Sequence, residues 1–240
     1  MAHFLNLVLG GMLIKLYEAI GVGSAEATQK AAAVNSTLAW ELLVAGILIA
    51  FFLIVRLTLS VQSPNPAQQV AEMIHEGIGG LGDQIIGPGY ERFQAFVTCI
   101  FLFVLLNNLL GLVPGIATPT AQPYVPLAIA VLTFLYYNFH GVRVHGHKYV
   151  KQFLGPLPAI AILMFPIEIV SHLARVMSLT IRLYANMFAS DMLTLVWFSL
   201  IPLAVPSVFL GLHAAVSVIQ AFVFMLLSMI YLSMAVSHEH

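Results

Sequence analysis

Long runs of hydrophobic residues dominate the chain, and short polar or proline- and glycine-rich stretches separate them. Residues 38–55, 93–113 and 125–139 form three such runs, and two longer runs follow at about 157–198 and 203–236. An α-helix needs ~20 mainly apolar residues to cross a bilayer. The pattern therefore predicts an all-α membrane protein with about five transmembrane helices.

The last two runs are longer than a bilayer requires. At ~1.5 Å per residue, a helix over 157–198 would measure about 60 Å, roughly twice the hydrocarbon thickness. Such a helix must tilt or kink, and Pro166 is the candidate for a kink. Pro202 and Pro206 confine the turn between the two helices to a short corner. We expect residues 157–237 to form a long, strongly tilted antiparallel hairpin.

A further helical pattern lies between the first two spans. Apolar residues recur there every three or four positions, at Val70, Ile74, Ile78, Leu81 and Ile85. Acidic residues lie off this stripe, so the segment is too polar to cross lipid and should lie in the membrane plane. Glycines from Gly77 onward weaken the helical prediction beyond Ile78.

The N-terminal region differs from the rest of the chain. Its apolar stretch resembles a signal peptide in part, but no basic residue precedes it and Lys15 ends it early. This favours an interfacial or outer segment over residues 1–37 rather than a cleaved leader. Residues 38–240 then form the polytopic membrane domain.

Basic residues indicate the orientation of the chain. They fall in two of the connections between spans, at Arg56, Arg92, Arg143, Lys148 and Lys151. The connections at 114–124 and 199–206 carry no charge. Because short cytoplasmic loops are enriched in Lys and Arg, the basic connections should be cytoplasmic. Five spans then place the N-terminus outside and the C-terminus in the cytoplasm.

Composition excludes several classes of function. Apolar residues make up 60% of the chain and charged residues 8%, with a net charge of −1, which argues against a nucleic-acid partner. The single cysteine, Cys99, excludes a disulfide framework. His145 and His147 lack a third ligand nearby and are better explained by a solvated basic loop than by a metal site. No metal and no cofactor are expected.

The predicted hairpin carries two groups of polar residues. At 100° per residue, one face of its first helix holds Glu168, His172, Arg175, Ser178, Arg182 and Asn186. Asp191 lies on roughly the opposite face, about 13 Å further along the axis than Arg182. The second helix contributes His213, Ser217 and Gln220. The sequence therefore predicts two polar tracks that differ in depth and in direction.

Structural roles would explain several of these residues. Ser178, Ser217 and Asn186 could serve as helix–helix hydrogen-bonding groups. Glu168 could form an ion cluster with His172 and Arg175 near the cytoplasmic interface.

Arg182 resists such an explanation. An arginine near the bilayer centre costs about 3 kcal/mol on insertion scales, so it is retained for a partner or a function. Glu168 lies about 21 Å away along the axis, and Asp191 faces away. We therefore expect its carboxylate partner on another polypeptide. Guanidinium stays protonated at physiological pH, so Arg182 is a fixed charge and not a proton carrier.

Several segments carry a family resemblance. The motif MSLTIRLYANMFASDM, preceded by FPIEIVSHLAR and followed by AAVSVIQAFVFMLLSMIYLSMAVSHEH, resembles subunit a of the rotary ATP synthase, and NNLLGLVPGIATPTA resembles an earlier span and outer loop of that family. Two positions depart from the family pattern: Asp191 replaces the usual Glu, and Ala185 replaces a frequent Gly. The N-terminal 35 residues carry no such resemblance.

The resemblance implies roles for individual residues. Arg182 would be the essential arginine facing the ring of c subunits, with Asn186 beside it. Asp191, His213 and Gln220 would line the outer proton half-channel. Glu168 and Ser178 would belong to the cytoplasmic half-channel, where His172 and Arg175 are further candidates.

It also implies a mechanism and partners. Protons would enter near Asp191 and His213 and neutralise a ring carboxylate. They would leave toward Glu168 and Ser178, because a cation within ~4–6 Å lowers a carboxyl pKa by about 1–3 units. The subunit would not be catalytic alone and would bind no nucleotide. Its partners would be the c-ring, the b-subunit stalk and the lipid of a bacterial inner membrane.

A stand-alone ion- or proton-coupled secondary transporter is the alternative class. No inverted repeat is visible in the sequence, and the chain offers Arg182 no partner, which disfavours a transporter. Asp191 and His213 favour H⁺ over Na⁺ as the coupling ion. If the hairpin is antiparallel, these two residues lie at similar depth and should approach each other, with Gln220 one to two turns deeper in a wet pocket. Either residue of the pair could carry the proton.

Overall fold

The structure of the chain is a computed structural model. It describes residues 14, 24–60, 65–113, 116, 118–146, 161–200 and 204–236. Most of the predicted N-terminal interfacial segment, the basic loop beyond residue 146 and the centre of the hairpin turn lie outside the described residues. The chain divides into two compact units, residues 1–53 and 54–240, and each is considered by itself.

The first unit contains most of helix α2 (Ser24–Leu57), whose last turn belongs to the second unit. Its segment Ser36–Leu57 is long and apolar enough to span a membrane. The helix begins fourteen residues before the predicted start at residue 38. Polar residues before that point end the hydrophobic run without ending the helix, because the sequence has neither proline nor glycine between 25 and 45.

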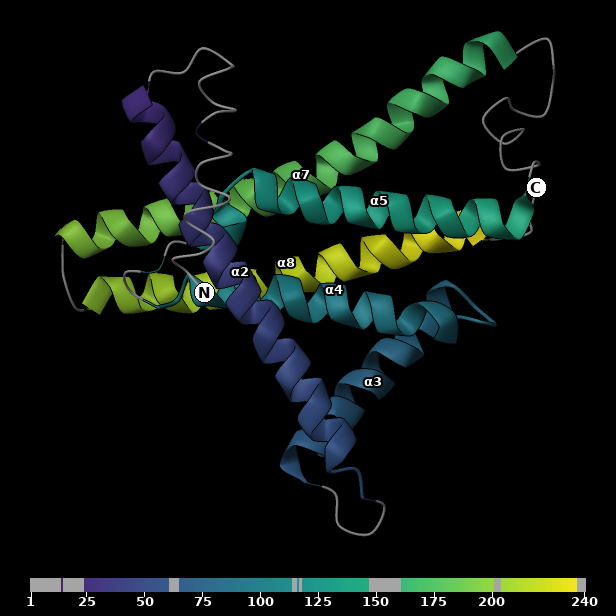
Figure 1. Cartoon of the computed structure of the whole chain (residues 1–240), viewed down its shortest axis with the longest axis horizontal. Helices are drawn as coiled ribbons and strands as arrows, with labels where there is room; N and C mark the ends of the chain where they lie inside the picture. Colours follow the sequence, from purple (N-terminus) through teal and green to yellow (C-terminus); the bar gives the residue numbers. More distant parts are fainter. Residues whose placement is uncertain are drawn as a thin grey trace. The chain divides into compact units, whose positions relative to one another are not determined.

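The bundle of the second unit consists of long helices that pack side by side (Figure 1). They are α4 (Glu91–Leu110), α5 (Tyr124–His145), α7 (Ala161–Leu200) and α8 (Ala204–Val236). Helix α8 contacts the other three, and α5 also packs on α7. The core between them is apolar and includes Val104, Ile129, Leu183, Met187 and Ala221.

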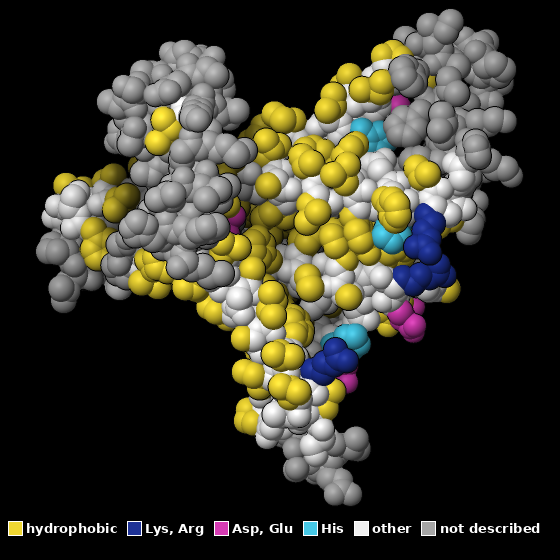
Figure 2. All heavy atoms as spheres, viewed as in Figure 1, with side chains coloured by type: hydrophobic (Ala, Val, Ile, Leu, Met, Phe, Trp, Pro, Cys, Tyr) yellow, Lys and Arg dark blue, Asp and Glu magenta, His cyan; other side chains and the backbone are white. Residues whose placement is uncertain are grey.

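Membrane-spanning character is clear for most of the long helices. Among the described residues, four helices are long and apolar enough to span, namely α2, α4, α5 and α8. The fifth expected span, α7, is the longest at 40 residues, but it contains Glu168, Arg175, Arg182 and Asp191. Hydrophobic side chains cover much of the visible surface of the bundle (Figure 2). The chain is an all-α membrane protein, as predicted.

Helices α7 and α8 form the predicted antiparallel hairpin. Progressively later residues of α7 meet progressively earlier residues of α8: Arg175 contacts Tyr231, Arg182 contacts Gln220, and Asp191 contacts His213. Pro166 lies inside α7, within its first turns. The tilt of the hairpin in a bilayer and a kink at Pro166 stay predictions.

Helix α3 (Pro66–Ile85) corresponds to the predicted amphipathic segment. It continues to Ile85 although its glycines argued against helix beyond Ile78. Two of these glycines provide close approach to the start of α4: a Cβ atom at Gly79 would lie 2.9 Å from Gln94 Nε2, and one at Gly82 would lie 2.8 Å from Tyr90 Cδ2. Packing against α4 therefore outweighs the low helix propensity of glycine.

The connection from α4 to α5 folds back onto the bundle. It contains a short 3-10 helix, η1 (Pro119–Ala121), which contacts α7 as well as α4 and α5. Thr118 and Thr120 are fully buried in this connection. The sequence marked this stretch only as an outer loop, and its contact with α7 places polar side chains beside Asp191.

Candidate functional site

A polar cluster forms where the α4–α5 connection meets α7 and α8. Asp191 Oδ1 accepts a hydrogen bond from the Thr118 hydroxyl at 2.7 Å, and the same oxygen lies 3.6 Å from His213 Nδ1. The His213 side chain is 1% exposed and that of Asp191 is 17% exposed. The predicted approach of Asp191 and His213 is confirmed.

The hydrogen bonding of His213 limits where protons can lie. Its Nε2 is 3.3 Å from the carbonyl oxygen of Asn108, and a carbonyl can only accept, so Nε2 carries the hydrogen. In a neutral imidazole, Nδ1 would then present a lone pair to the Asp191 oxygen. An attractive contact therefore requires one further proton, either on Nδ1 or on the carboxylate.

A second layer of hydrogen bonds surrounds this pair. The Asn108 side chain donates to the Ser217 carbonyl at 3.3 Å and accepts from the Thr120 hydroxyl at 2.6 Å. All three residues are fully buried, and together they link α4, the connection and α8. Sequence reasoning assigned no role to Asn108, Thr118 or Thr120. Two adjacent asparagines inside an apolar span, followed by a loop with two nearby threonines, were the available signal.

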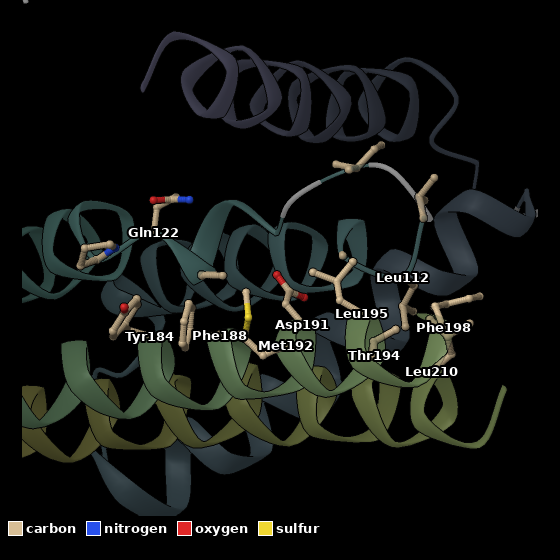
Figure 3. Close-up of a pocket in the computed structure, with 15 residues that line it drawn as sticks. Leu112, Gln122, Tyr184, Phe188, Asp191, Met192, Thr194, Leu195, Phe198 and Leu210 are labelled. Carbon is tan, nitrogen blue, oxygen red and sulfur yellow. The ribbon is translucent and has the colours of Figure 1, made fainter. Parts of the chain in front are cut away.

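An open cavity of about 520 Å³ adjoins the cluster. Asp191 is one of its lining residues, along with Gln122 and Thr194, and most of the wall is apolar. Figure 3 shows Tyr184, Phe188, Asp191 and Met192 lining it from α7. A volume of this size is large enough for many water molecules, and Asp191 is one of the polar residues at its wall.

Gln220 continues the buried polar face of α8 beyond His213 and Ser217. Gln220 is buried, and its Nε2 donates to the Arg182 carbonyl at 2.8 Å. It therefore joins the two helices at the level of the arginine. A void of about 10 Å³, close to the space that one water needs, lies between Arg182, Gln220 and the neighbouring apolar residues.

The Arg182 side chain lies on an exposed flank of α7 that also holds Ser178 and Asn186. Within the described part of the chain, no carboxylate forms an ion pair with its guanidinium. Asp191 is directed instead to Thr118 and His213. The charge is thus left for a partner outside the described residues.

The predicted cytoplasmic group divides into two environments. His172 is buried, with Nε2 3.4 Å from Glu168 Oε1 and Nδ1 3.0 Å from the Tyr137 hydroxyl. Arg175 lies over the ring of Tyr231, 5.4 Å from its centroid. The six residues predicted to share one face span about 120° of the helix, so one edge of that face meets α5 while the other stays exposed.

Comparison with known proteins gives a consistent result. A family model described as ATP synthase A chain matches residues 38–233. The chain is 44% identical over 238 residues to ATP synthase subunit a of Koribacter versatilis, covering 99% of this chain and 96% of that one. It is 45% identical over 201 residues to ATP synthase subunit a of Solibacter usitatus, covering 83% and 86%. The first match includes the N-terminal region, for which the sequence alone indicated no relative.

Proposed function

Because the chain belongs to the ATP synthase A chain family, we propose that it is the stator subunit of a rotary proton motor, with two offset proton paths separated by Arg182. The relatives named above are all ATP synthase subunits, which favours this role over a stand-alone transporter. The observation that carries the proposal is the exposed Arg182 on one flank of α7, which has no ion pair among the described residues, with the Asp191–His213 pair on another flank.

The outer path begins in the cavity beside Asp191. A proton from its water is taken up at the Asp191–His213 pair, whose facing Oδ1 and Nδ1 atoms lie 3.6 Å apart. The path continues along the buried face of α8 toward Gln220, which lies at the level of Arg182. It ends at a carboxylate on the neighbouring c-ring.

Arg182 supplies a permanent positive charge to that carboxylate. Guanidinium does not lose its proton, so it cannot pass protons directly between the two paths. Its charge favours the ionised form of an approaching carboxylate and so drives proton release. Ser178 and Asn186 lie on the same exposed flank and would border the ring there.

The released proton leaves by the cytoplasmic path. Glu168 and Ser178 line it, and the contact of His172 with Glu168 makes His172 a further candidate. Arg175, held over the ring of Tyr231 on α8, is another candidate for this path. Each proton that crosses 100 mV supplies ~2.3 kcal/mol for rotation.

The assembly follows from the same roles. The subunit works within the complex and is not catalytic alone; the c-ring contacts the flank of α7, and the b-subunit stalk holds the stator. The chain resides in the bacterial inner membrane with its N-terminus outside and its C-terminus in the cytoplasm.

Substitution of Arg182 tests the proposal in the assembled complex. Arg182→Ala should abolish ATP-driven proton pumping into vesicles while the complex still assembles, because the ring carboxylate loses its cation. Arg182→Lys should retain little activity, since an ammonium lacks the planar fork and can lose its proton when desolvated.

The matched control is Arg143→Ala, which removes an exposed arginine near the end of α5 and should pump normally. Near-normal pumping by Arg182→Ala would refute the proposed function.

A further inference from the structure

The α4–α5 connection approaches α4 so closely at Gly111 that no side chain fits there. A Cβ atom added at Gly111 would overlap the Thr118 hydroxyl and would lie 3.0 Å from His213 Nε2. Gly111 has φ −64° and ψ −13°, values that any residue adopts, so its backbone does not call for glycine. Glycine is needed at position 111 because its missing side chain leaves room for the Thr118 hydroxyl.

The Thr118 hydroxyl occupies that space and makes a single directed contact. Thr118 is fully buried, and its hydroxyl donates to Asp191 Oδ1 at 2.7 Å. A buried hydroxyl without a partner is costly, so Thr118 and the carboxylate restrain each other. The oxygen held in this way is the one that faces His213 Nδ1 at 3.6 Å.

We propose that Thr118 is a positioning residue of the outer proton path and that Gly111 provides the gap through which it reaches Asp191. This inference rests on the proposed function. Thr118 does not relay the proton; its hydrogen bond fixes the rotation of the carboxylate, so that Oδ1 stays beside Nδ1 and the pair can exchange one proton. The same bond ties the α4–α5 connection to α7 at the edge of the cavity.

The test uses the complete ATP synthase in vesicles, with proton flux driven by an imposed membrane potential and measured against external pH. Thr118→Val removes the donor at similar volume, whereas Thr118→Ser retains it. The control is Thr133→Val, because Thr133 is also fully buried but donates to the Ile129 carbonyl within α5. We expect about tenfold lower flux for the valine variant, as for loss of a hydrogen bond to a charged group. The serine variant and the control should match the wild type.

The pH profile separates positioning from a general structural effect. Loss of a hydrogen bond to the charged form disfavours the ionised carboxylate, so the flux profile of Thr118→Val should shift to higher external pH. A purely structural defect would lower flux by the same factor at every pH. A uniform loss of this kind would overturn the inference.

Gly111 provides an independent arm. Gly111→Ala should lower flux because its methyl group displaces the Thr118 hydroxyl. In the Thr118→Ala background the overlap with the hydroxyl is gone, and only the 3.0 Å approaches to the Cβ of residue 118 and to His213 Nε2 remain. Adding Gly111→Ala there should therefore cause a much smaller loss than in the wild type. Additive losses would overturn the role of Gly111. If Gly111→Ala prevents assembly, the Thr118 series still decides the main point.

Besides a uniform loss at every pH, two further outcomes of the Thr118 series overturn the inference: wild-type flux and profile in Thr118→Val, or equal loss in the serine and valine variants. Arg182→Ala, assayed in the same vesicles, separates this failure from failure of the proposed function. If Arg182→Ala is inactive while Thr118→Val is normal, only the positioning role is wrong. If Arg182→Ala pumps normally, the proposed function itself is wrong.

Discussion

Asp191 meets His213 because the two residues lie at matching distances from the turn of an antiparallel hairpin. That approach followed from the sequence by counting positions. The contact of Thr118 with Asp191 could not be predicted by counting positions. Thr118 lies in a loop, and the path of that loop depends on Gly111 having no side chain. Residues on regular helices were thus predictable, and the residue that orients them was not.

Asp191→Asn is the residue-scale prediction. The amide oxygen can still accept from Thr118, but the side chain can no longer ionise, so proton entry should slow by about 10²-fold, as for loss of a general acid–base group. Water in the cavity and His213 can substitute in part, so some flux should remain, in contrast to Arg182→Ala.

Passive proton flux at fixed potential provides the measurement. Asp191→Glu is the matched control, because it restores the acid with one more methylene and should retain much of the flux. An asparagine variant with wild-type flux across the pH range would remove Asp191 from the path.

At the scale of elements, α3 shows where propensity and packing disagree. Its apolar stripe predicted the helix, and its glycines argued that the helix should end near Ile78. The helix continues because Gly79 and Gly82 let Gln94 and Tyr90 approach its backbone. Such a contact depends on a neighbouring helix and leaves no local trace in the sequence.

Glycines on the two sides of α3 should therefore respond in opposite ways to alanine. Gly82→Ala should destabilise the α3–α4 packing by about 1–3 kcal/mol, because its Cβ would overlap the Tyr90 ring. Gly80→Ala is the control: its Cβ would meet nothing within 4 Å. It should stabilise the helix by about 0.5–1 kcal/mol.

The measurement heats the detergent-extracted complex and determines the temperature at which this chain is no longer found in the soluble complex. That temperature reports the change in stability. The prediction requires Gly82→Ala below the wild type and Gly80→Ala at or above it. An equal decrease of this temperature in both variants would argue against close packing at Gly82.

At the scale of the whole molecule, hydropathy predicted the class of protein and most of its spans. The expected fifth span, α7, departs from a purely apolar composition because of the charged residues that the proposed function uses. Likewise, the start of α2 was missed because hydropathy marks where lipid contact begins rather than where a helix begins. The residues that lie in the membrane and the residues that form the helix need not coincide. The hydropathy of the sequence indicates the membrane-spanning residues more directly than it indicates the ends of the helix.

Orientation is the prediction at this scale. In a Cys99→Ser background, Arg143→Cys should be labelled by a membrane-impermeant maleimide only from the cytoplasmic side, and Val113→Cys only from the outside. The expectation rests on the Lys and Arg distribution. Both positions are exposed in the structure: Val113 lies in the connection that follows α4, and Arg143 lies in the last turn of α5, at the end away from that connection. Outside labelling of residue 143 in sealed right-side-out cells would reverse the topology.

The exposed flank of α7 has a mechanical consequence. Beside Arg182 it carries the small side chains Ser178, Ala185 and Ala189. Under the proposed function, a ring that turns past these three positions meets only small side chains there and has little to interlock with. Each additional ~1.4 kcal/mol of favourable contact in the resting position would raise the barrier to the next rotational step and slow that step about tenfold. The size of the side chains at these positions would therefore limit the rate of rotation. Bulky substitutions at Ala185 or Ala189 would slow rotation without changing any proton-carrying group.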